Sequence, residues 1–270
     1  GVRNEHVLTM HEYVVEGVLG PTVFFDAFEG GIPLDAFLRQ NPDLGFDGRV
    51  QIVEQVASAL AYCHKKDIRH GALGPHAVLV RRDSARRVET RLFNFQLGSG
   101  QHTRGTAHWS ALASDRWAVY QAPELREEAF GPTPASDVFS LGAIAYLVFT
   151  GRPPATSVLD LDARLARDHH LDPCQVTENV TEKLADAIKV ATARSLETRP
   201  DDAGEWINQL LADIPQPAPA LAAAELDPLL ARRDDVLAGG LLVQTVLGHG
   251  ATSRVLRVER ESDHRVYALK

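Results

Sequence analysis

Cysteine and aromatic residues are scarce in this sequence. Its 270 residues include two cysteines, and aromatic residues make up 7%. Cys63 and Cys174 lie far apart and neither has metal-ligand spacing around it, so the sequence excludes a disulfide framework and favours reduced thiols in the cytoplasm. No metal site is expected either, because the scattered histidines have no cysteine or carboxylate at ligand spacing.

The sequence also lacks an excess of positive charge and a long apolar run. Lys and Arg number 28 against 36 Asp and Glu, which gives a net charge of -8. Nucleic acid is therefore not expected as a partner, because binding to a phosphate backbone depends on clustered cations. The longest apolar run, residues 141–149, is roughly half of the ~20 residues that a membrane-spanning helix requires. We expect no membrane partner.

What is present is the composition of a globular protein, with 44% hydrophobic and 24% charged residues. The chain begins with Gly1 and stops at Lys270 inside a strand-like run. We therefore expect it to be a fragment of a larger polypeptide.

Hydrophobic periodicity predicts both strands and helices. Strands are expected over residues 6–17, 22–28, 77–80 and 88–95, and helices over 47–65, 136–150, 180–196 and 202–211. Residues 213–224 carry three prolines without apolar periodicity, which is typical of a linker. The predicted organisation is a domain over 1–212, a Pro/Ala-rich linker over 213–237 and a β segment over 238–270.

Six motifs in order give residues 20–206 a resemblance to the protein kinase superfamily, of the bacterial Ser/Thr type. Residues 62–80, YCHKKDIRHGALGPHAVLV, resemble the catalytic loop H-R-D-x-K-x-x-N. The other five are TVFFDAFEGGIPLDAFL (hinge), LFNFQLG (metal-binding turn), YQAPEL (A-P-E), SDVFSLGAIAYLVFTGRPP (D-x-x-S-x-G helix) and ARSLETRP (late arginine). The resemblance implies an α+β fold with a mostly helical C-lobe and a partial β N-lobe.

The catalytic groups of the family are absent at the matching positions. Ala72 stands for the catalytic Asp, Gly74 for the loop Lys and Ala77 for the Mg-binding Asn, and D-F-G becomes Asn94, Phe95 and Gln96. A general base is worth about 10²–10⁴ in rate, and the metal adds further charge stabilisation. The resemblance therefore implies a pseudokinase.

Residues that shape the C-lobe in the family are kept. They are His70, Phe95, Glu124, Asp137, Gly142 and Arg199. The resemblance implies a Glu124–Arg199 ion pair and a contact of Asp137 with the backbone of the catalytic loop.

The tail resembles the start of a second kinase domain. LGHGATSRVLRV resembles the glycine loop G-x-G-x-x-S-x-V, and VYALK resembles V-A-I-K. The ATP-binding residues implied are Gly248, Gly250, Ser253, Val255 and Lys270. Together with DPLLARRDDVL, the tail is similar to the kinase start in NERD-associated kinases of phage-defence systems. ATP is expected in this segment, and Mg only in the complete parent protein.

Two functions stay open. In the first, residues 1–212 regulate or scaffold a neighbouring kinase domain of the same polypeptide, which acts on protein substrates. In the second, they form an atypical active kinase that transfers the ATP γ-phosphate without the usual Asp residues. A third arrangement, in which residues 238–270 complete the N-lobe of the first domain, is also open.

Overall fold

Helix α5 (Pro134–Thr150) forms the centre of the larger part of the chain, because residues 135–149 are all buried. Its start is fixed by Thr133 and Ser136, whose side chains and backbone N–H groups form a reciprocal capping box. Gly151 ends the helix in the left-handed conformation, with φ of 71°, which glycine adopts without strain. The sequence prediction of a helix over 136–150 is confirmed.

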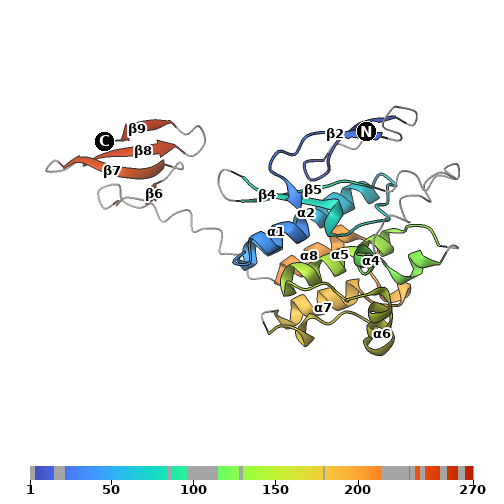
Figure 1. Cartoon of the computed structure of the whole chain (residues 1–270). Coiled ribbons are helices and arrows are strands. Elements are labelled where there is room, and N and C mark those ends of the chain that lie inside the picture. The colour runs from blue at the N-terminus through green and yellow to red at the C-terminus, as the bar shows by residue number, and fades with distance from the viewer. Residues whose placement is uncertain are drawn as a thin grey trace. The chain divides into compact units, whose positions relative to one another are not determined.

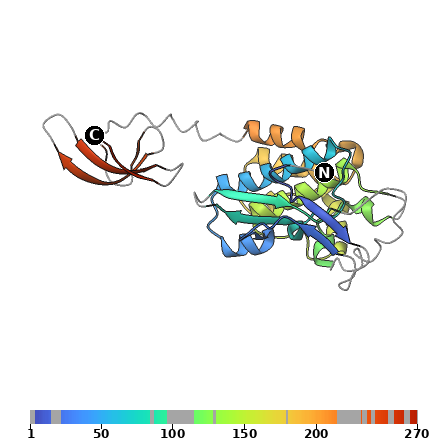
Figure 2. The same cartoon turned by 90° about the horizontal axis from the view of Figure 1, so that it is seen from above.

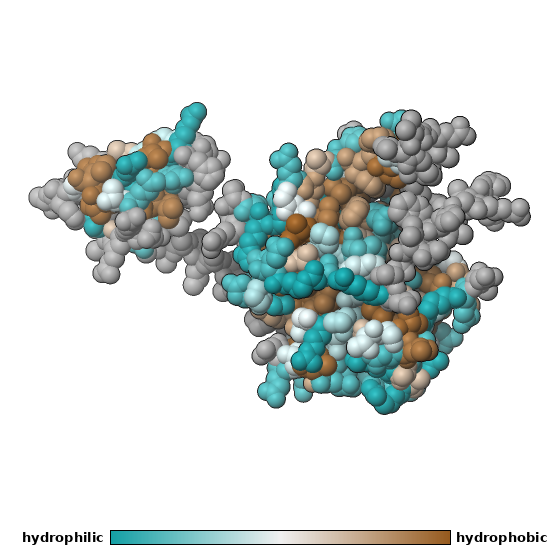
Figure 3. Space-filling view, in the orientation of Figure 1, coloured by the Kyte–Doolittle hydropathy of each residue, from teal (hydrophilic) through white to brown (hydrophobic). Residues whose placement is uncertain are grey.

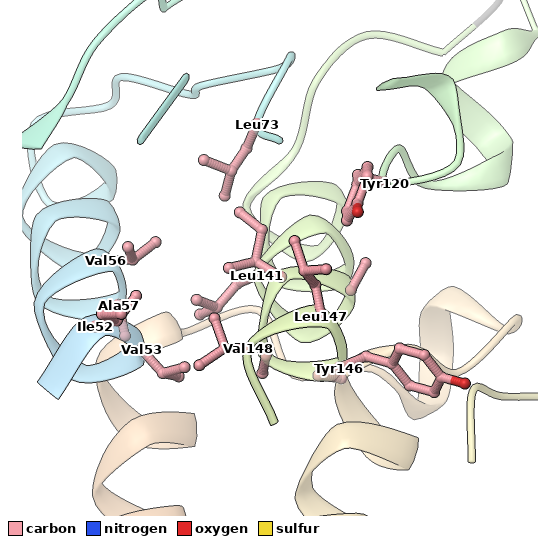
Figure 4. Packing of buried hydrophobic residues seen from close by; sticks show 14 of the residues in the cluster. Ile52, Val53, Val56, Ala57, Leu73, Tyr120, Leu141, Tyr146, Leu147 and Val148 are labelled. Atoms are coloured by element: carbon pink, nitrogen blue, oxygen red, sulfur yellow. The ribbon is translucent and has the colours of Figure 1, made fainter. Parts of the chain in front are cut away.

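Helix α2 (Phe46–His64) packs against α5 and confirms the helix predicted over 47–65. Figure 4 shows Ile52, Val53 and Val56 of α2 on the side that faces α5. Val50, Val53, Val56, Leu60 and Cys63 are spaced so that they lie on one side of this helix, and all five are buried. This packing of two apolar helices makes the core on which the candidate site stands.

The structure is a computed structural model, and it describes residues 4–14, 22–83, 87–95, 115–127, 130–178, 180–213, 231, 235–237, 241–249, 254–260 and 265–269. The chain divides into two units, Gly1–Ile214 and Pro215–Lys270. The remaining helices of the first unit are α1 (Leu34–Gln40), α4 (Asp115–Ala118), α6 (Val158–Asp168), α7 (Glu182–Ala191) and α8 (Ala203–Asp213). Short 3-10 turns are η1 (Pro75–Ala77), η2 (Pro123–Arg126), η3 (Pro173–Gln175) and η4 (Leu196–Thr198).

Two small antiparallel sheets complete the first unit. One pairs β1 (Met10–Val14) with β2 (Thr22–Phe25), and the other has the order β3 (Ile32–Pro33), β4 (Val78–Arg82) and β5 (Val88–Leu92). In Figures 1 and 2, β4 and β5 lie over α2, with the helices of the unit on one side of them. The β1–β2 hairpin leaves Met10 45% and Phe24 50% exposed, and apolar residues gather over this part of the visible face in Figure 3.

The second unit is one antiparallel sheet of order β6 (Val236–Leu237), β7 (Leu241–His249), β8 (Arg254–Arg260) and β9 (Val266–Leu269). Val243, Leu256 and Val258 are buried in its small core with Leu237 and Ala231. The sheet begins at β6, inside the range that the sequence assigned to the linker, because Val236 and Leu237 pair with β7.

Several helices differ from the sequence prediction, among them the short α1 and α4, which lie outside the predicted helix ranges. α6 was not predicted, although Ser157 caps its start and Leu161 and Leu165 bury one face. The helix predicted over 180–196 covers only Glu182–Ala191, and a 3-10 turn follows at Leu196–Thr198.

Candidate functional site: a catalytic loop without catalytic side chains

The backbone of residues 70 and 71 is held by the carboxylate of Asp137, which lies in the first turn of α5. Asp137 Oδ2 accepts hydrogen bonds from the backbone N–H of His70 at 2.7 Å and from Nε2 of His64 at 2.9 Å. Its Oδ1 accepts from the backbone N–H of Gly71 at 2.9 Å. The side chain of Asp137 is 1% exposed, so three N–H donors compensate a buried charge. The contact implied by the resemblance is therefore present.

His70 ties the same loop to the strand region after β5. Its Nε2 donates to the carbonyl of Phe93 at 3.0 Å, because a carbonyl can only accept. Its Nδ1 then accepts from the backbone N–H of Ala72 at 3.3 Å. Burial lowers the pKa of His70, although the charge of Asp137 acts in the opposite direction. His70 is thus a neutral, fully buried histidine that positions backbone.

Residues 72, 74 and 77 of the loop carry no functional group in their side chains. Ala72 is half-buried, Gly74 is buried and Ala77 is 0% exposed. A phosphoryl-transfer site needs a carboxylate to accept the proton of the attacking hydroxyl and oxygen atoms to hold Mg²⁺. A buried methyl group at residue 77 supplies neither.

Asn94 lies at the position of the metal-binding Asp and has a positive φ of 61°. Its side chain is exposed, and the neighbouring Phe95 ring packs on His70 with 4.5 Å between ring centroids. Gln96 lies outside the described residues. Among the residues described here, Asn94 offers one neutral oxygen and Ala77 offers none, so this set does not fit Mg²⁺, a hard cation that prefers carboxylates.

The Glu124–Arg199 ion pair implied by the resemblance is also present. Arg199 Nη1 lies 2.7 Å from Glu124 Oε1 and Nη2 lies 3.3 Å from Oε2. The guanidinium also donates to the carbonyls of Ala193, Ala135 and Arg194, so that all five N–H groups are used. The side chain of Arg199 is 0% exposed and lies over the ring of Phe139 at 5.0 Å. This pair fixes η2 to the end of the η4 turn.

Gly142 allows α5 to approach the end of α7. A Cβ atom at this position would lie 2.7 Å from Cβ of Ala191 and 2.8 Å from Cγ2 of Thr192. The close packing of α5 against the end of α7 therefore explains why a glycine stands at residue 142.

Sequence reasoning missed a group beside the catalytic loop. His76 stacks on Trp117 at 5.0 Å between centroids, and Arg116 lies over the Trp117 ring at 4.4 Å while bonding to Asp35. Burial lowers the pKa of His76 to about 4, His70 acts in the same direction and Asp35 opposes. The only signal in the sequence was a Trp shortly before YQAPEL.

In the second unit, β7 and β8 carry two of the residues implied to bind ATP. Gly248 pairs with Val255 where β7 and β8 approach their connecting turn, and a Cβ at Gly248 would meet no atom within 4 Å. The fold of the described residues therefore does not itself require a glycine there. Gly250, Ser253 and Lys270 lie outside the described residues.

Two kinds of feature are absent from the described residues. They contain no helix long and apolar enough to cross a membrane. They also contain no group of three or more His, Cys, Asp or Glu side chains arranged to hold a metal ion.

Fold and site together define a protein-kinase-like C-lobe: a helical core around α5, an Asp at its start that holds a catalytic loop, and a buried Glu–Arg pair. A family model for the protein kinase domain matches residues 3–220. The chain belongs to the protein kinase family, and its fold is the α+β fold expected from the resemblance.

Several of the relatives that the chain matches are bacterial kinases. A probable kinase, PglW, of Streptomyces coelicolor is 31% identical over 295 residues, which cover 95% of this chain and 19% of PglW. The serine/threonine-protein kinase drp72 of Corynebacterium efficiens is 25% identical over 236 residues, which cover 84% of this chain and 44% of drp72. The chain thus spans less than half the length of these relatives.

A solved structure shares the fold. The structure of Rad53 residues 1–466 in complex with AMP-PNP matches with a TM-score of 0.58 at 19% identity, covering 77% of this chain and 51% of Rad53. At this identity the likeness concerns the fold alone. The matches to bacterial kinases place the chain among bacterial Ser/Thr-kinase-like proteins.

Proposed function

We propose that residues 1–212 are a catalytically inactive, regulatory or scaffolding kinase-like domain within a larger bacterial Ser/Thr kinase. The observation that carries this proposal is the catalytic loop, which is held in place by Asp137 and His70 but presents Ala72 and Ala77 where the chemistry needs acid and amide oxygens. The scaffold is preserved and the reacting groups are absent. Such a domain acts through its surfaces, on the neighbouring kinase domain of the same polypeptide.

Residues 238–270 are the ATP-phosphate-binding start of that neighbouring kinase domain. The antiparallel order β7, β8, β9 supports this, because in the sequence Gly250 follows the end of β7 and Lys270 follows the end of β9. Backbone N–H groups of Gly248 and Gly250 approach the phosphates of ATP and Lys270 pairs with them. Mg²⁺ ligands come from the complete parent protein, which phosphorylates protein substrates in the cytoplasm.

Transfer of labelled phosphate from ATP by the complete parent polypeptide tests both statements. Lys270→Met should abolish incorporation into the parent and into a general protein substrate. Asn94→Ala should leave incorporation unchanged, because the first domain does no chemistry. Lys66→Met, which removes an exposed lysine of the first domain, is the matched control.

The alternative, an atypical active kinase in residues 1–212, gives the opposite pattern. Incorporation that survives Lys270→Met and is lost in Asn94→Ala would overturn the pseudokinase proposal. It would assign phosphate transfer to a site in which the Asn94 amide handles the metal–ATP complex.

A further inference from the structure

The space beside residue 74 of the catalytic loop is occupied from within the chain. A Cβ atom built on Gly74 would lie 3.0 Å from Nδ1 and 3.1 Å from Cε1 of His76. The backbone of Gly74 is extended, with φ of -167° and ψ of 177°, which any residue adopts. It is therefore the His76 imidazole, and not the backbone conformation, that opposes a side chain two residues after Ala72.

The imidazole is held in this place by a chain of contacts that reaches another element. Its ring lies on Trp117 of α4, with centroids 5.0 Å apart and planes 34° apart. The Arg116 guanidinium lies 4.4 Å from the Trp117 ring and pairs with Asp35, in the first turn of α1. Asp35 is 14% exposed and also pairs with Arg39, so it is a fixed anchor.

His76 is half-buried, and hydrogen bonds of its Nδ1 atom do not explain this placement. Its Nδ1 is buried and has no hydrogen-bond partner among the residues described. The stabilising contact that this placement provides is therefore the one between the His76 and Trp117 rings.

We propose that His76 and Trp117, held by the Arg116–Asp35 pair, form an internal plug that closes the catalytic loop at residues 72–77 to an incoming protein hydroxyl. The proposal rests on the proposed function and adds to it: the first domain is closed sterically as well as deprived of its chemical groups. The proposed function and the proposed plug can fail separately, because phosphate transfer tests for catalysis and the access of an external reagent to His76 tests for the plug.

Carbethoxylation by diethyl pyrocarbonate measures this access, because the reagent attacks neutral imidazole and the site of modification is read by peptide mass spectrometry. At pH 7 His76, with a pKa of about 4, is fully neutral and would react rapidly if it were open. In the wild-type chain we expect it to react at least about tenfold more slowly than the exposed His169. Trp117→Ala should abolish this protection while the rate at His169 stays the same.

Two further variants keep the test decisive if Trp117→Ala does not fold. Arg116→Gln removes the clamp but keeps both rings, and should raise the His76 rate by a smaller factor. Gly74→Ala should lower the urea midpoint of the wild-type chain, and should lower it much less in a His76→Ala background. That coupling appears only if the imidazole fills the space beside residue 74.

The proposal is wrong if His76 in the wild-type chain reacts as fast as His169. It is equally wrong if Gly74→Ala has the same effect with and without His76. A plug that is confirmed while the parent protein still shows Asn94-dependent phosphate transfer would instead overturn the proposed inactivity.

Discussion

Replacing Glu124 by Ala is the sharpest test of what holds this fold together. The change leaves the Arg199 guanidinium, which is 0% exposed, with a buried positive charge and two N–H groups that have lost their acceptors. The carbonyls of Ala193, Ala135 and Arg194 still accept three hydrogen bonds, but they carry no net charge to balance the cation.

Breaking one side of a buried ion pair typically costs about 3–5 kcal/mol. We therefore expect Glu124→Ala to lower the free energy of unfolding by about 3–5 kcal/mol. Glu124→Gln keeps one oxygen acceptor and should cost less, about 1–3 kcal/mol. The matched control is Asp162→Ala, which breaks the Arg126–Asp162 pair on the same η2 turn, where Asp162 is 49% exposed. A surface pair is worth about 0–1 kcal/mol.

Urea unfolding followed by tryptophan fluorescence measures these differences. All three tryptophans, Trp109, Trp117 and Trp206, belong to the first unit, so the signal reports on the unit that contains the ion pair. If Glu124→Ala costs no more than Asp162→Ala, the buried pair does not stabilise this fold and the reasoning is refuted.

Three other perturbations have defined outcomes. The pKa of His76 is lower in the folded than in the unfolded chain, so its contribution to the free energy of unfolding is complete above pH 6.5 and decreases as the pH falls toward 4. In His76→Gln, the loss of stability between pH 6.5 and 4, measured by urea unfolding, should be smaller by about 1–3 kcal/mol. Gly142→Ala should cost about 1–3 kcal/mol in thermal unfolding because its Cβ would meet Ala191, whereas Gly131→Ala, with open space around it, should cost little. Asn94→Gly should be neutral in the same assay and Asn94→Ala should cost about 1 kcal/mol, because φ is 61°; equal stability of the two would contradict this account.

Much of the core could be predicted from the sequence because local pattern and burial agree there. The spacing of Val53, Val56 and Leu60 puts them on one face of α2, and that face is the one that packs on α5. The Glu124–Arg199 pair was expected only through the resemblance to kinases. Nothing in local spacing connects two residues that lie 75 positions apart.

Other features of the structure could not be predicted from the sequence, and each has a physical reason. The apolar residues of α6 that become buried, Leu161 and Leu165, are too few to mark a helix in a stretch rich in Asp and Arg. The stack of His76 on Trp117 joins the catalytic loop to a segment that follows residues 96–114, so only the folded chain brings the two rings together. The predicted roles of Gly250, Ser253 and Lys270 stay predictions, since these residues lie outside the part of the chain that is described.

The contacts of Asp137 and Arg199 explain how a kinase fold accommodates the residues found at positions 72, 74 and 77. Asp137 accepts from the backbone N–H groups of His70 and Gly71, and Arg199 donates to three backbone carbonyls. These anchors hold main chain, so they do not depend on which side chains stand at residues 72, 74 and 77. Substitution of the catalytic side chains therefore costs the fold little, whereas loss of an anchor would release the whole loop.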